Sequence, residues 1–261
     1  MIWFNDRLVD ESQGSALLPI SDRSFLLGEG LFETLLTLAG NAVALDRHIA
    51  RIHSGAAILG IAVPTHDAIA IAVTSVLQST REIALGRMRI TISGSGSFLV
   101  THHPYKEWSE PAKLVTYPHP LNAKSPLQRV KSTSYGEYLM AYRYAQERNA
   151  DDALLFNTSD QVMEASTANI IALIGGKWVT PPLSAGPLPG ITRELLMEWG
   201  LISERELIFE ELARCESIGL ISSLRSIQPV AEINGRKYKT GGKVEEISTL
   251  YKGSLAGNLN P

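Results

Sequence analysis

The stretch VMEASTANIIALIGGKWVTPPLSAGPLPGITRE, residues 162–194, places an isolated acid at the entrance of an apolar segment. Glu164 stands among small residues and leads into the β-branched run 170–174, which two glycines end. This pattern predicts a buried strand. A carboxylate at the edge of such a strand is costly to bury unless a positive or hydrogen-bonding group meets it. We therefore expect Glu164 to have a specific partner.

The second half of the same stretch predicts an anion site. Residues 186–190, GPLPG, cannot be helical, whereas residues 191–196 have helical spacing. The first backbone N–H groups of a helix have no partner within the helix, and they bind anions such as phosphate. Glu164 and this turn could therefore hold two ends of one small cofactor, and the rest of the chain should supply its reactive partner.

Length, charge and cysteine content narrow the class of protein. A chain of 261 residues suits one large or two modest domains. A net charge of −3 predicts neither a nucleic-acid nor an anionic-membrane partner. The single cysteine excludes an intrachain disulfide and suits a reducing compartment. No apolar run of roughly 18 residues is present, and the N-terminus lacks a signal-peptide pattern, so we expect a cytoplasmic protein.

The N-terminal part of the chain predicts mixed strands and helices. A hairpin at Asn5–Asp6 and a loop with two glycines are expected to precede the main strand. The glycines are weak evidence for phosphate binding, because no helix opens after them. The predicted elements here are a strand over 1–9, a strand over 31–38, a helix over 46–59 capped by Asp46, a helix over 65–78, and strands over 86–93 and 113–117.

Arg51 is the first cationic candidate for an anion site. On the helix predicted over 46–59, it shares one face with His48 and Ile52, so its side chain could point inward. Most helical arginines are solvated, and that alternative stays open from spacing alone. The pair His102–His103 resembles a metal pair, but no further ligand cluster lies near it. We therefore expect a solvated or substrate-side loop there and no metal site.

Residues 117–126, YPHPLNAKSP, hold three prolines and predict an interdomain linker. The expected domains are then 1–116 and 127–261. In the second domain the pattern predicts helices over 138–148, 191–199 and 212–215, strands over 153–157, 207–209 and 218–221, a hairpin over 230–239, and a last helix that ends in a disordered tail. The loop 222–226 could be a second arm of an anion seat, although an ordinary polar turn has the same composition.

Lys131, Glu164 and the turn 190–194 taken together resemble the class IV aminotransferase family, the enzymes of pyridoxal-phosphate (PLP) fold type IV. The resemblance covers nearly the whole chain. It includes the segments IWFN (2–5), GEGLFET (28–34), HIARIH (48–53), EASTANI (164–170) and SIQPV (226–230). It implies an α/β (α+β), two-domain D-amino acid aminotransferase-like fold, with PLP between the domains and a homodimer as the assembly.

The resemblance also implies roles for individual residues. Lys131 matches the lysine that forms a Schiff base with PLP and then moves protons at the substrate Cα. Glu164 matches the carboxylate that keeps the pyridine nitrogen protonated, which makes the ring a better electron sink. The phosphate-binding positions fall on Arg51, Ile191, Thr192, Ser223 and Leu224.

The substrate side is less defined. A tyrosine of the family reaches the ring hydroxyl shortly after the lysine; here Tyr135 and Tyr138 flank that place and Gly136 occupies it. The loop after Ile92 lacks the further arginine and Gly-Tyr pair of familiar lyases. The substrate-binding candidates are therefore Phe32, Arg87, Arg89, Tyr135 and Arg225, with His102 or His103 as further carboxylate partners.

The compact length and the 33-residue step from Lys131 to Glu164 favour one branch of the family, 4-amino-4-deoxychorismate lyase. This enzyme eliminates pyruvate from its substrate and leaves 4-aminobenzoate, a step of folate synthesis. The alternative is an aminotransferase of branched-chain or D-amino acid type, which would use the same cofactor-binding residues. A third alternative, a PLP-binding protein without catalysis, predicts a lesion in those residues, and the sequence contains none.

Overall fold

The computed structural model describes residues 1–10, 12 and 18–261, which form two compact units. The first unit comprises 1–106, 130–135 and 258–261, and the second comprises 107–129 and 136–257. The domain bounds 1–116 and 127–261 stay a prediction. The short segment 130–135, which contains Lys131, belongs to the first unit, whereas the residues on either side of it in the sequence belong to the second.

The first unit contains a six-stranded antiparallel sheet in the order β2-β1-β6-β5-β3-β4. Its strands are β1 (Ile2–Phe4), β2 (Arg7–Val9), β3 (Gly30–Leu38), β4 (Asn41–Ala42), β5 (Leu85–Ser93) and β6 (Phe98–Pro104). The predicted hairpin between β1 and β2 is confirmed, with Asn5 at φ 57°. The long strands predicted over 31–38 and 86–93 are also confirmed.

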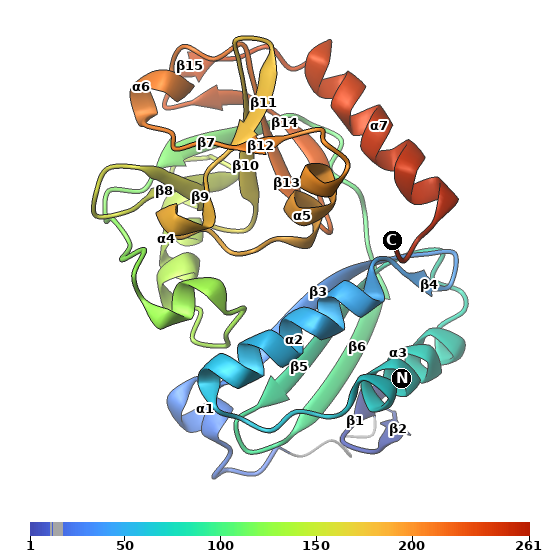
Figure 1. Cartoon of the computed structure of the whole chain (residues 1–261). Coiled ribbons are helices and arrows are strands. Elements are labelled where there is room, and N and C mark those ends of the chain that lie inside the picture. Colours follow the sequence, from blue (N-terminus) through green and yellow to red (C-terminus); the bar gives the residue numbers. More distant parts are fainter. Residues whose placement is uncertain (11, 13–17) are drawn as a thin grey trace. The chain divides into compact units, whose positions relative to one another are not determined.

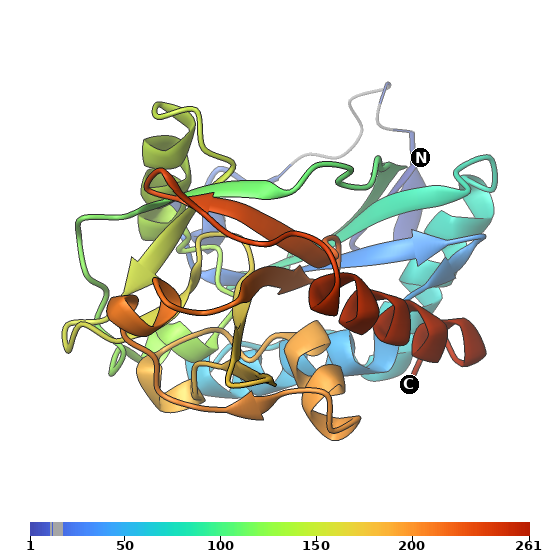
Figure 2. The same ribbon diagram turned by 90° about the horizontal axis from the view of Figure 1, so that it is seen from above.

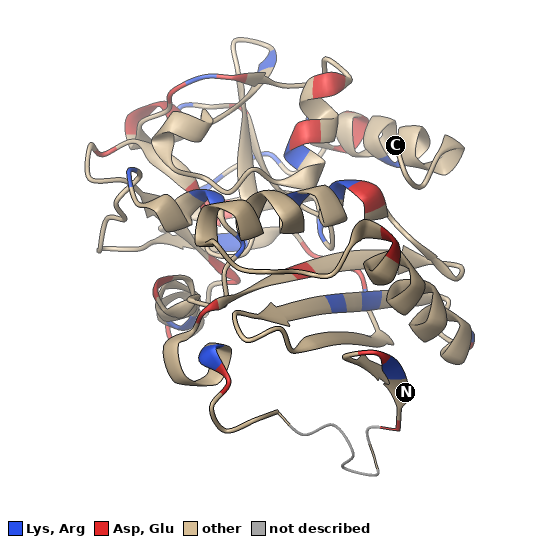
Figure 3. Ribbon diagram, turned by 60° about the horizontal axis from the view of Figure 1, so that its bottom comes forward, with Lys and Arg blue, Asp and Glu red and all other residues tan. Residues whose placement is uncertain are grey.

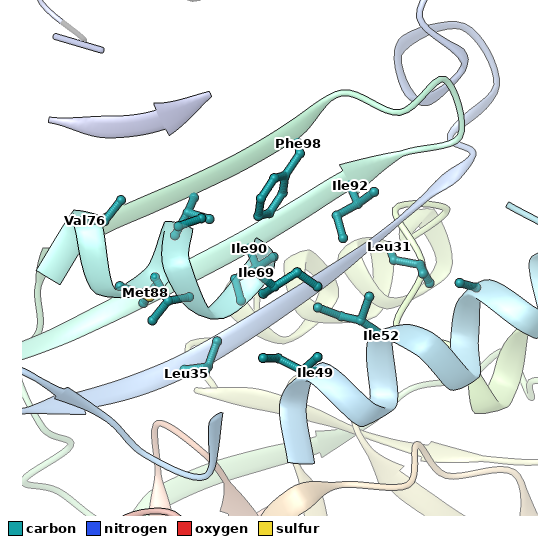
Figure 4. Packing of buried hydrophobic residues seen from close by; sticks show 14 of the residues in the cluster. Leu31, Leu35, Ile49, Ile52, Ile69, Val76, Met88, Ile90, Ile92 and Phe98 are labelled. Atoms are coloured by element: carbon teal, nitrogen blue, oxygen red, sulfur yellow. The ribbon is translucent and has the colours of Figure 1, made fainter. Parts of the chain in front are cut away.

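Two helices, α2 (Leu45–Leu59) and α3 (His66–Ser79), pack against one face of this sheet (Figure 1). The core between them is mostly aliphatic, and Figure 4 shows its side chains pointing inward from strands and helices alike. Its labelled members are Leu31, Leu35, Ile49, Ile52, Ile69, Val76, Met88, Ile90, Ile92 and Phe98. This core fixes α2, and with it every side chain that α2 presents to β3.

The predicted N-cap of α2 is wrong. Asp46 lies within the first turn, and the residue that precedes the helix is Ala44, in a left-handed conformation without a side-chain cap. Helix α3, in contrast, has a side-chain N-cap, because the Thr65 hydroxyl accepts from the Ala68 N–H.

A short helix, α1 (Arg23–Leu27), occupies part of the predicted loop. Its N-cap Asp22 is buried and accepts hydrogen bonds from the hydroxyls of Ser24, Ser93 and Ser97. Burial alone would raise the pKa of Asp22, but these bonds and the Ser24 N–H outweigh it and lower the pKa to about 2. Asp22 therefore ties the start of α1 to the β5–β6 turn.

The second unit contains a mixed nine-stranded sheet in the order β12-β11-β10-β13-β14-β7-β8-β9, with β15 paired to β14. Its strands are β7 (Ala112–Thr116), β8 (Asp152–Phe156), β9 (Val162–Ala165), β10 (Asn169–Ile174), β11 (Lys177–Thr180), β12 (Ser203–Glu204), β13 (Ser217–Ser222), β14 (Ser226–Ile233) and β15 (Arg236–Lys237). The strands predicted over 170–174, 153–157 and 218–221 are confirmed, as is the hairpin around Asn234–Gly235.

The helices of the second unit are α4 (Gly136–Gln146), α5 (Ile191–Glu198), α6 (Phe209–Leu212) and α7 (Lys243–Gly257), with 3-10 turns at Pro126–Arg129 and Leu183–Ala185. Helix α7 lies along β14 and β13 (Figure 2). The strand predicted over 207–209 is wrong, since α6 begins at Phe209 and only Ile208 makes an isolated bridge. In the apolar segment 207–209, Leu207 packs into the core although the segment does not pair with a strand over its length.

The predicted disordered tail after α7 is also wrong. Residues 258–261 group with the first unit and hydrogen-bond to the start of α2. Acidic and basic side chains are interspersed over each unit, without a long run of one sign (Figure 3). Within the described residues, none of the helices combines the length and the apolar character needed to cross a bilayer.

Candidate active site

Lys131 lies on a segment that continues the sheet of the first unit. The Lys131 carbonyl accepts from the Phe32 N–H at 2.9 Å, and Thr133 N–H donates to the Gly30 carbonyl at 2.9 Å. Ser132 and Leu31 form an antiparallel bridge. These backbone contacts hold residues 130–133 along the beginning of β3, so the position of Lys131 is set by the sheet.

Phe32 is the centre of a cationic and aromatic group. The Lys131 Nζ lies 4.5 Å from the centroid of the Phe32 ring, and the Arg89 guanidinium carbon lies 4.0 Å from it. Tyr135 meets the same ring edge to face at 5.3 Å, and Lys131 Nζ lies 5.9 Å from the Tyr135 ring. The structure thus brings together four predicted site residues of the first unit.

Arg87 and His103 lie on the same face of the sheet as Phe32, because alternate residues of a strand point to the same face. In β5, Met88 and Ile90 point into the core, so Arg87 and Arg89 point to the opposite face, which carries Phe32. His103 pairs with Arg87 in the register of β5 and β6 and is exposed.

His102 points to the other face, where both of its ring nitrogens are engaged. Its Nε2 lies 2.7 Å from the Thr37 hydroxyl and its Nδ1 lies 2.7 Å from the Thr80 hydroxyl. Of the two histidines, only His103 shares the face with the arginines.

On the core side of β3, Glu33 is buried beneath α2 and meets two of its side chains. Arg51 donates to Glu33 from Nε and from Nη2, each at 2.7 Å, and His48 Nδ1 lies 2.6 Å from Oε2. Burial opposes the charged Glu33, but Arg51 and His48 outweigh it and hold the Glu33 pKa well below its usual range. Burial also lowers the pKa of His48, more than Glu33 raises it, so His48 is neutral near pH 7 and donates from Nδ1.

Glu33 sets the orientation of the Arg51 side chain. The inward orientation is confirmed, since the guanidinium lies next to a buried carboxylate rather than fully in solvent. The Nε–Nη2 edge of the guanidinium is bound to Glu33. Contact with a phosphate through the remaining edge stays a prediction.

In the second unit, Glu164 on β9 is almost fully buried, with 3% of its surface exposed. Its Oε1 lies 3.0 Å from the Tyr138 hydroxyl and accepts from the Leu188 N–H at 3.2 Å, while Oε2 accepts from Asn169 Nδ2 at 2.9 Å. The expectation that this acid has specific partners is therefore confirmed. Hydrogen bonds to a carboxylate favour its charged form and fix its orientation.

The predicted anion-binding turn has the geometry it needs. Helix α5 begins at Ile191, and its N-cap Gly190 offers no side-chain acceptor to the first N–H groups. A Cβ at Gly190 would lie 1.9 Å from Asn169 Oδ1, so only glycine fits beside the partner of Glu164. The Thr192 hydroxyl is buried 3.4 Å from the Tyr251 hydroxyl. The carboxylate and the helix start are thus linked through Asn169.

Ser223 and Leu224 lie in the turn between β13 and β14, and their contact with a phosphate stays a prediction. Arg225 follows them, but its guanidinium turns away from solvent. Nη2 donates to Asp152 and to Thr167, each at 2.9 Å, and the group lies 4.3 Å over the Trp108 ring. Asp152 already balances its charge, which argues against the predicted role in binding a substrate carboxylate.

The chain matches the amino-transferase class IV family model over residues 30–233. It belongs to this family. A Schizosaccharomyces pombe protein described as an aminodeoxychorismate lyase is 30% identical over 204 residues, which are 76% of this chain and 87% of that protein. The D-alanine aminotransferase of Bacillus licheniformis is 24% identical over 279 residues, 97% of this chain and 96% of that protein.

A solved structure of a branched-chain aminotransferase from Thermoproteus uzoniensis, with norvaline, superposes with a TM-score of 0.88 at 25% identity, covering 98% of this chain and 94% of that one. The predicted fold type IV is confirmed. Enzymes of this family depend on PLP, so the protein is a PLP-dependent enzyme. Its residues fit the cofactor: a lysine, a buried hydrogen-bonded carboxylate and a helix start without its own cap.

Sequence reasoning missed Glu33, Asn169 and Asp152. Glu33 had a signal, because an acid within the apolar strand GLFETLL must have a buried partner. Asn169 and Asp152 had no local signal, since short polar residues next to strands are common in turns.

Proposed function

We propose that the protein is a 4-amino-4-deoxychorismate lyase, which eliminates pyruvate and forms 4-aminobenzoate. The observation that supports this best is the pair Arg87 and Arg89, which lie on the same sheet face as Phe32 and Lys131. Two arginines two residues apart in a strand suit a substrate with two carboxylates, because each guanidinium binds one carboxylate through paired hydrogen bonds. The similarity to the S. pombe protein points in the same direction.

In this proposal PLP is held by the residues that the family resemblance implies. Lys131 is the covalent anchor, Glu164 meets the pyridine nitrogen, and Arg51, Ile191, Thr192, Ser223 and Leu224 bind the phosphate. Tyr135 is favoured over Tyr138 for the ring hydroxyl, because it lies beside Lys131, whereas Tyr138 lies against Glu164. When bound, PLP supplies an electron sink for the charge that develops at the substrate Cα.

The protein's own residues then carry out the proton transfers and the binding. The Lys131 amine removes the proton from Cα, the ring carbon that carries the amino group. The bond between the neighbouring ring carbon and the enolpyruvyl oxygen then breaks and the ring becomes aromatic, while the released enolpyruvate takes up a proton to become pyruvate. Arg89 and Arg87 hold the two carboxylates, and Phe32 and Tyr135 pack against the ring of the substrate. Arg225 is retained only as a weaker substrate candidate, because Asp152 balances its charge.

The alternative is a class IV aminotransferase, supported by the full-length similarity to D-alanine aminotransferase. It would use the same lysine and phosphate site, but the amino group of the substrate would remain on the cofactor. Arg87 and Arg89 would then bind a dicarboxylic amino acid or keto acid.

We also propose a cytoplasmic homodimer. The helix α1 supports the dimer, since Phe25, Leu26 and Leu27 are 68, 59 and 65% exposed in the single chain. Adjacent exposed apolar side chains are typical of a protein–protein interface. Light scattering of the wild type and of Leu27→Glu would test this assembly, and a monomeric wild type would contradict it.

The deciding experiment gives the PLP-loaded enzyme either 4-amino-4-deoxychorismate or a panel of L- and D-amino acids. The lyase predicts release of pyruvate and 4-aminobenzoate in equal amounts, and no transfer of amino groups from the panel. Transfer of the amino group from any amino acid to a keto acid, without release of 4-aminobenzoate from 4-amino-4-deoxychorismate, would make the protein an aminotransferase. Arg89→Gln should raise the KM of the lyase substrate more than it lowers kcat, since it removes a binding group.

The variant Lys131→Ala tests whether Lys131 is the residue that binds PLP covalently. Borohydride reduction of the PLP-loaded wild type should fix the cofactor on Lys131, as mapped by mass spectrometry. If the variant keeps its visible absorbance after dialysis and the label is found on another lysine, the assignment of Lys131 is wrong.

A further inference from the structure

Asp152, the first residue of β8, is fully buried and its carboxylate is saturated with donors. It accepts from the N–H of Ala153, from the hydroxyls of Ser166 and Thr167, and from Arg225 Nη2. A carboxylate has about four lone-pair sites, so these contacts use its full capacity. Such a group fixes the positions of the segments that donate to it.

Arg225 is the counter-ion of Asp152 and is fixed just as firmly. Besides Asp152 and Thr167 it donates to Gln228, whose own Nε2 donates to the Glu110 carbonyl at 2.7 Å. Its guanidinium also lies over the Trp108 ring. The planar five-donor fork of arginine makes this set of contacts possible, and lysine cannot reproduce it.

The pair connects two segments that the proposed function assigns to the cofactor. Ser166 and Thr167 form the turn directly after β9, the strand that carries Glu164, and Arg225 directly follows Ser223 and Leu224. The Asp152–Arg225 pair therefore joins the turn beside the ring-binding carboxylate to the loop of the second phosphate arm. All of these residues belong to the second unit.

We propose that Asp152 and Arg225 are positioning residues for phosphate recognition. They hold the loop 222–226 so that the Ser223 hydroxyl and the Leu224 N–H meet the phosphate. The inference rests on the proposed cofactor site and separates the roles of its arginines. Arg225 acts on the cofactor through its neighbours in the loop, while Arg87 and Arg89 are left to bind the substrate.

If the Asp152–Arg225 pair served only the stability of the second unit, its mutation would affect ligand binding differently. Loss of a structural pair would weaken the binding of any ligand of the second unit in proportion to the loss of folded protein. Loss of a positioning pair would weaken the binding of PLP and leave the binding of pyridoxal, which lacks the phosphate, nearly unchanged. The ratio of the two dissociation constants separates the two roles.

The test compares Arg225→Lys with the wild type in apo-enzyme titrations with PLP and with pyridoxal. The variant keeps the positive charge beside Asp152 but loses the fork. We expect the Kd for PLP to rise roughly ten- to hundredfold, the size of one lost charge-assisted hydrogen bond, and the Kd for pyridoxal to change less than about threefold. Thr180→Val is the matched control, since it removes a buried hydrogen bond to the Ile170 carbonyl outside this network. It should leave the ratio at the wild-type value.

Thr167→Val provides a second variant that should fold, because Thr167 is exposed and valine has nearly its shape. It removes a hydroxyl that contacts both Asp152 and Arg225, and it should shift the ratio in the same direction. An unchanged ratio in both variants would overturn the inference. A wild type that binds PLP no better than pyridoxal would instead overturn the proposed phosphate site itself.

Discussion

Glu33, which has 1% of its surface exposed, accepts two hydrogen bonds of 2.7 Å each from one edge of the Arg51 guanidinium. A buried ion pair of this kind is weak evidence for stability, because desolvation offsets much of the attraction. Its geometry is nevertheless specific, since paired hydrogen bonds fix the plane of the guanidinium. Glu33 therefore determines the orientation in which α2 holds the Arg51 guanidinium, whose contact with a phosphate stays a prediction.

Glu33→Gln should destabilise the first unit markedly. The substitution leaves Arg51 buried beside a neutral amide, and breaking a buried pair typically costs about 3–5 kcal/mol. Urea unfolding followed by circular dichroism would measure the loss. Glu29→Gln is the control, because Glu29 pairs with Arg23 at the surface of the same unit and its loss should have little effect. Equal stability of the two variants would show that the Glu33 pair is not maintained in solution.

The stability of the protein should fall as the pH falls below about 6.5, partly because of His48. Burial lowers the pKa of His48, so below the unfolded value of about 6.5 the unfolded chain takes up a proton that the folded chain does not. Each pH unit in this window removes up to about 1.4 kcal/mol, until the folded pKa is reached. Glu33 adds to the loss only below its unfolded pKa of about 4.3, since its folded pKa is lower still.

The measurement is urea unfolding at pH 7.5 and pH 5.5. His48→Gln cannot titrate, so the difference between the two pH values should shrink in this variant. It should not vanish, because burial also lowers the pKa of His102, which shifts stability in the same direction. A variant with the full wild-type pH dependence would mean that His48 is not buried in its neutral form.

The elements that the sequence predicted well are those with local signals. Helix α3 needed only its amphipathic periodicity, and β5 needed only its strict alternation. The same alternation located Arg87 and Arg89 on one face before any contact was known. The family resemblance placed site residues at a helix start and at a buried carboxylate, and the structure has α5 beginning at Ile191 and Glu164 buried. Their contacts with the cofactor stay a prediction.

The features that sequence reasoning missed depend on contacts between distant residues. Asp152 and Arg225 are 73 residues apart, and neither has a local pattern that names the other. From the sequence alone, Arg225 is only a cation beside the predicted cofactor loop, which favours a substrate-binding role. The start of α2 was misjudged for the same reason, because its cap comes from the other end of the chain.

Cys215 should be almost unreactive in the folded protein. Burial raises the pKa of its thiol to about 12, so very little thiolate is present at pH 8. Ellman's reagent should react slowly under native conditions and rapidly in urea, with glutathione as the reference. Since the chain has no other cysteine, the signal reports this site alone. A native rate equal to that of glutathione would contradict the burial of the thiol.

Asn260 should stabilise α2 from outside the helix. Its Oδ1 accepts from the Asp46 N–H at 3.1 Å, and its Nδ2 donates to the Asp46 carboxylate at 2.8 Å. The first bond is what an N-cap side chain would make, and Ala44 cannot make it. Asn260→Ala should therefore cost about 0.5–2 kcal/mol, as the loss of a local cap does. Thr65→Ala, which removes the local cap of α3, provides the reference for that magnitude.

Hydrogen exchange resolves whether the loss arises at α2. In the wild type the amide of Asp46 should be protected, and in Asn260→Ala it should exchange much faster while the amides of α3 keep their rates. Because α2 also carries His48 and Arg51, the same variant should bind PLP more weakly than the wild type, whereas Thr65→Ala should not. An unprotected Asp46 amide in the wild type would mean that residues 258–261 do not cap α2, and the shift in PLP binding would then have no basis.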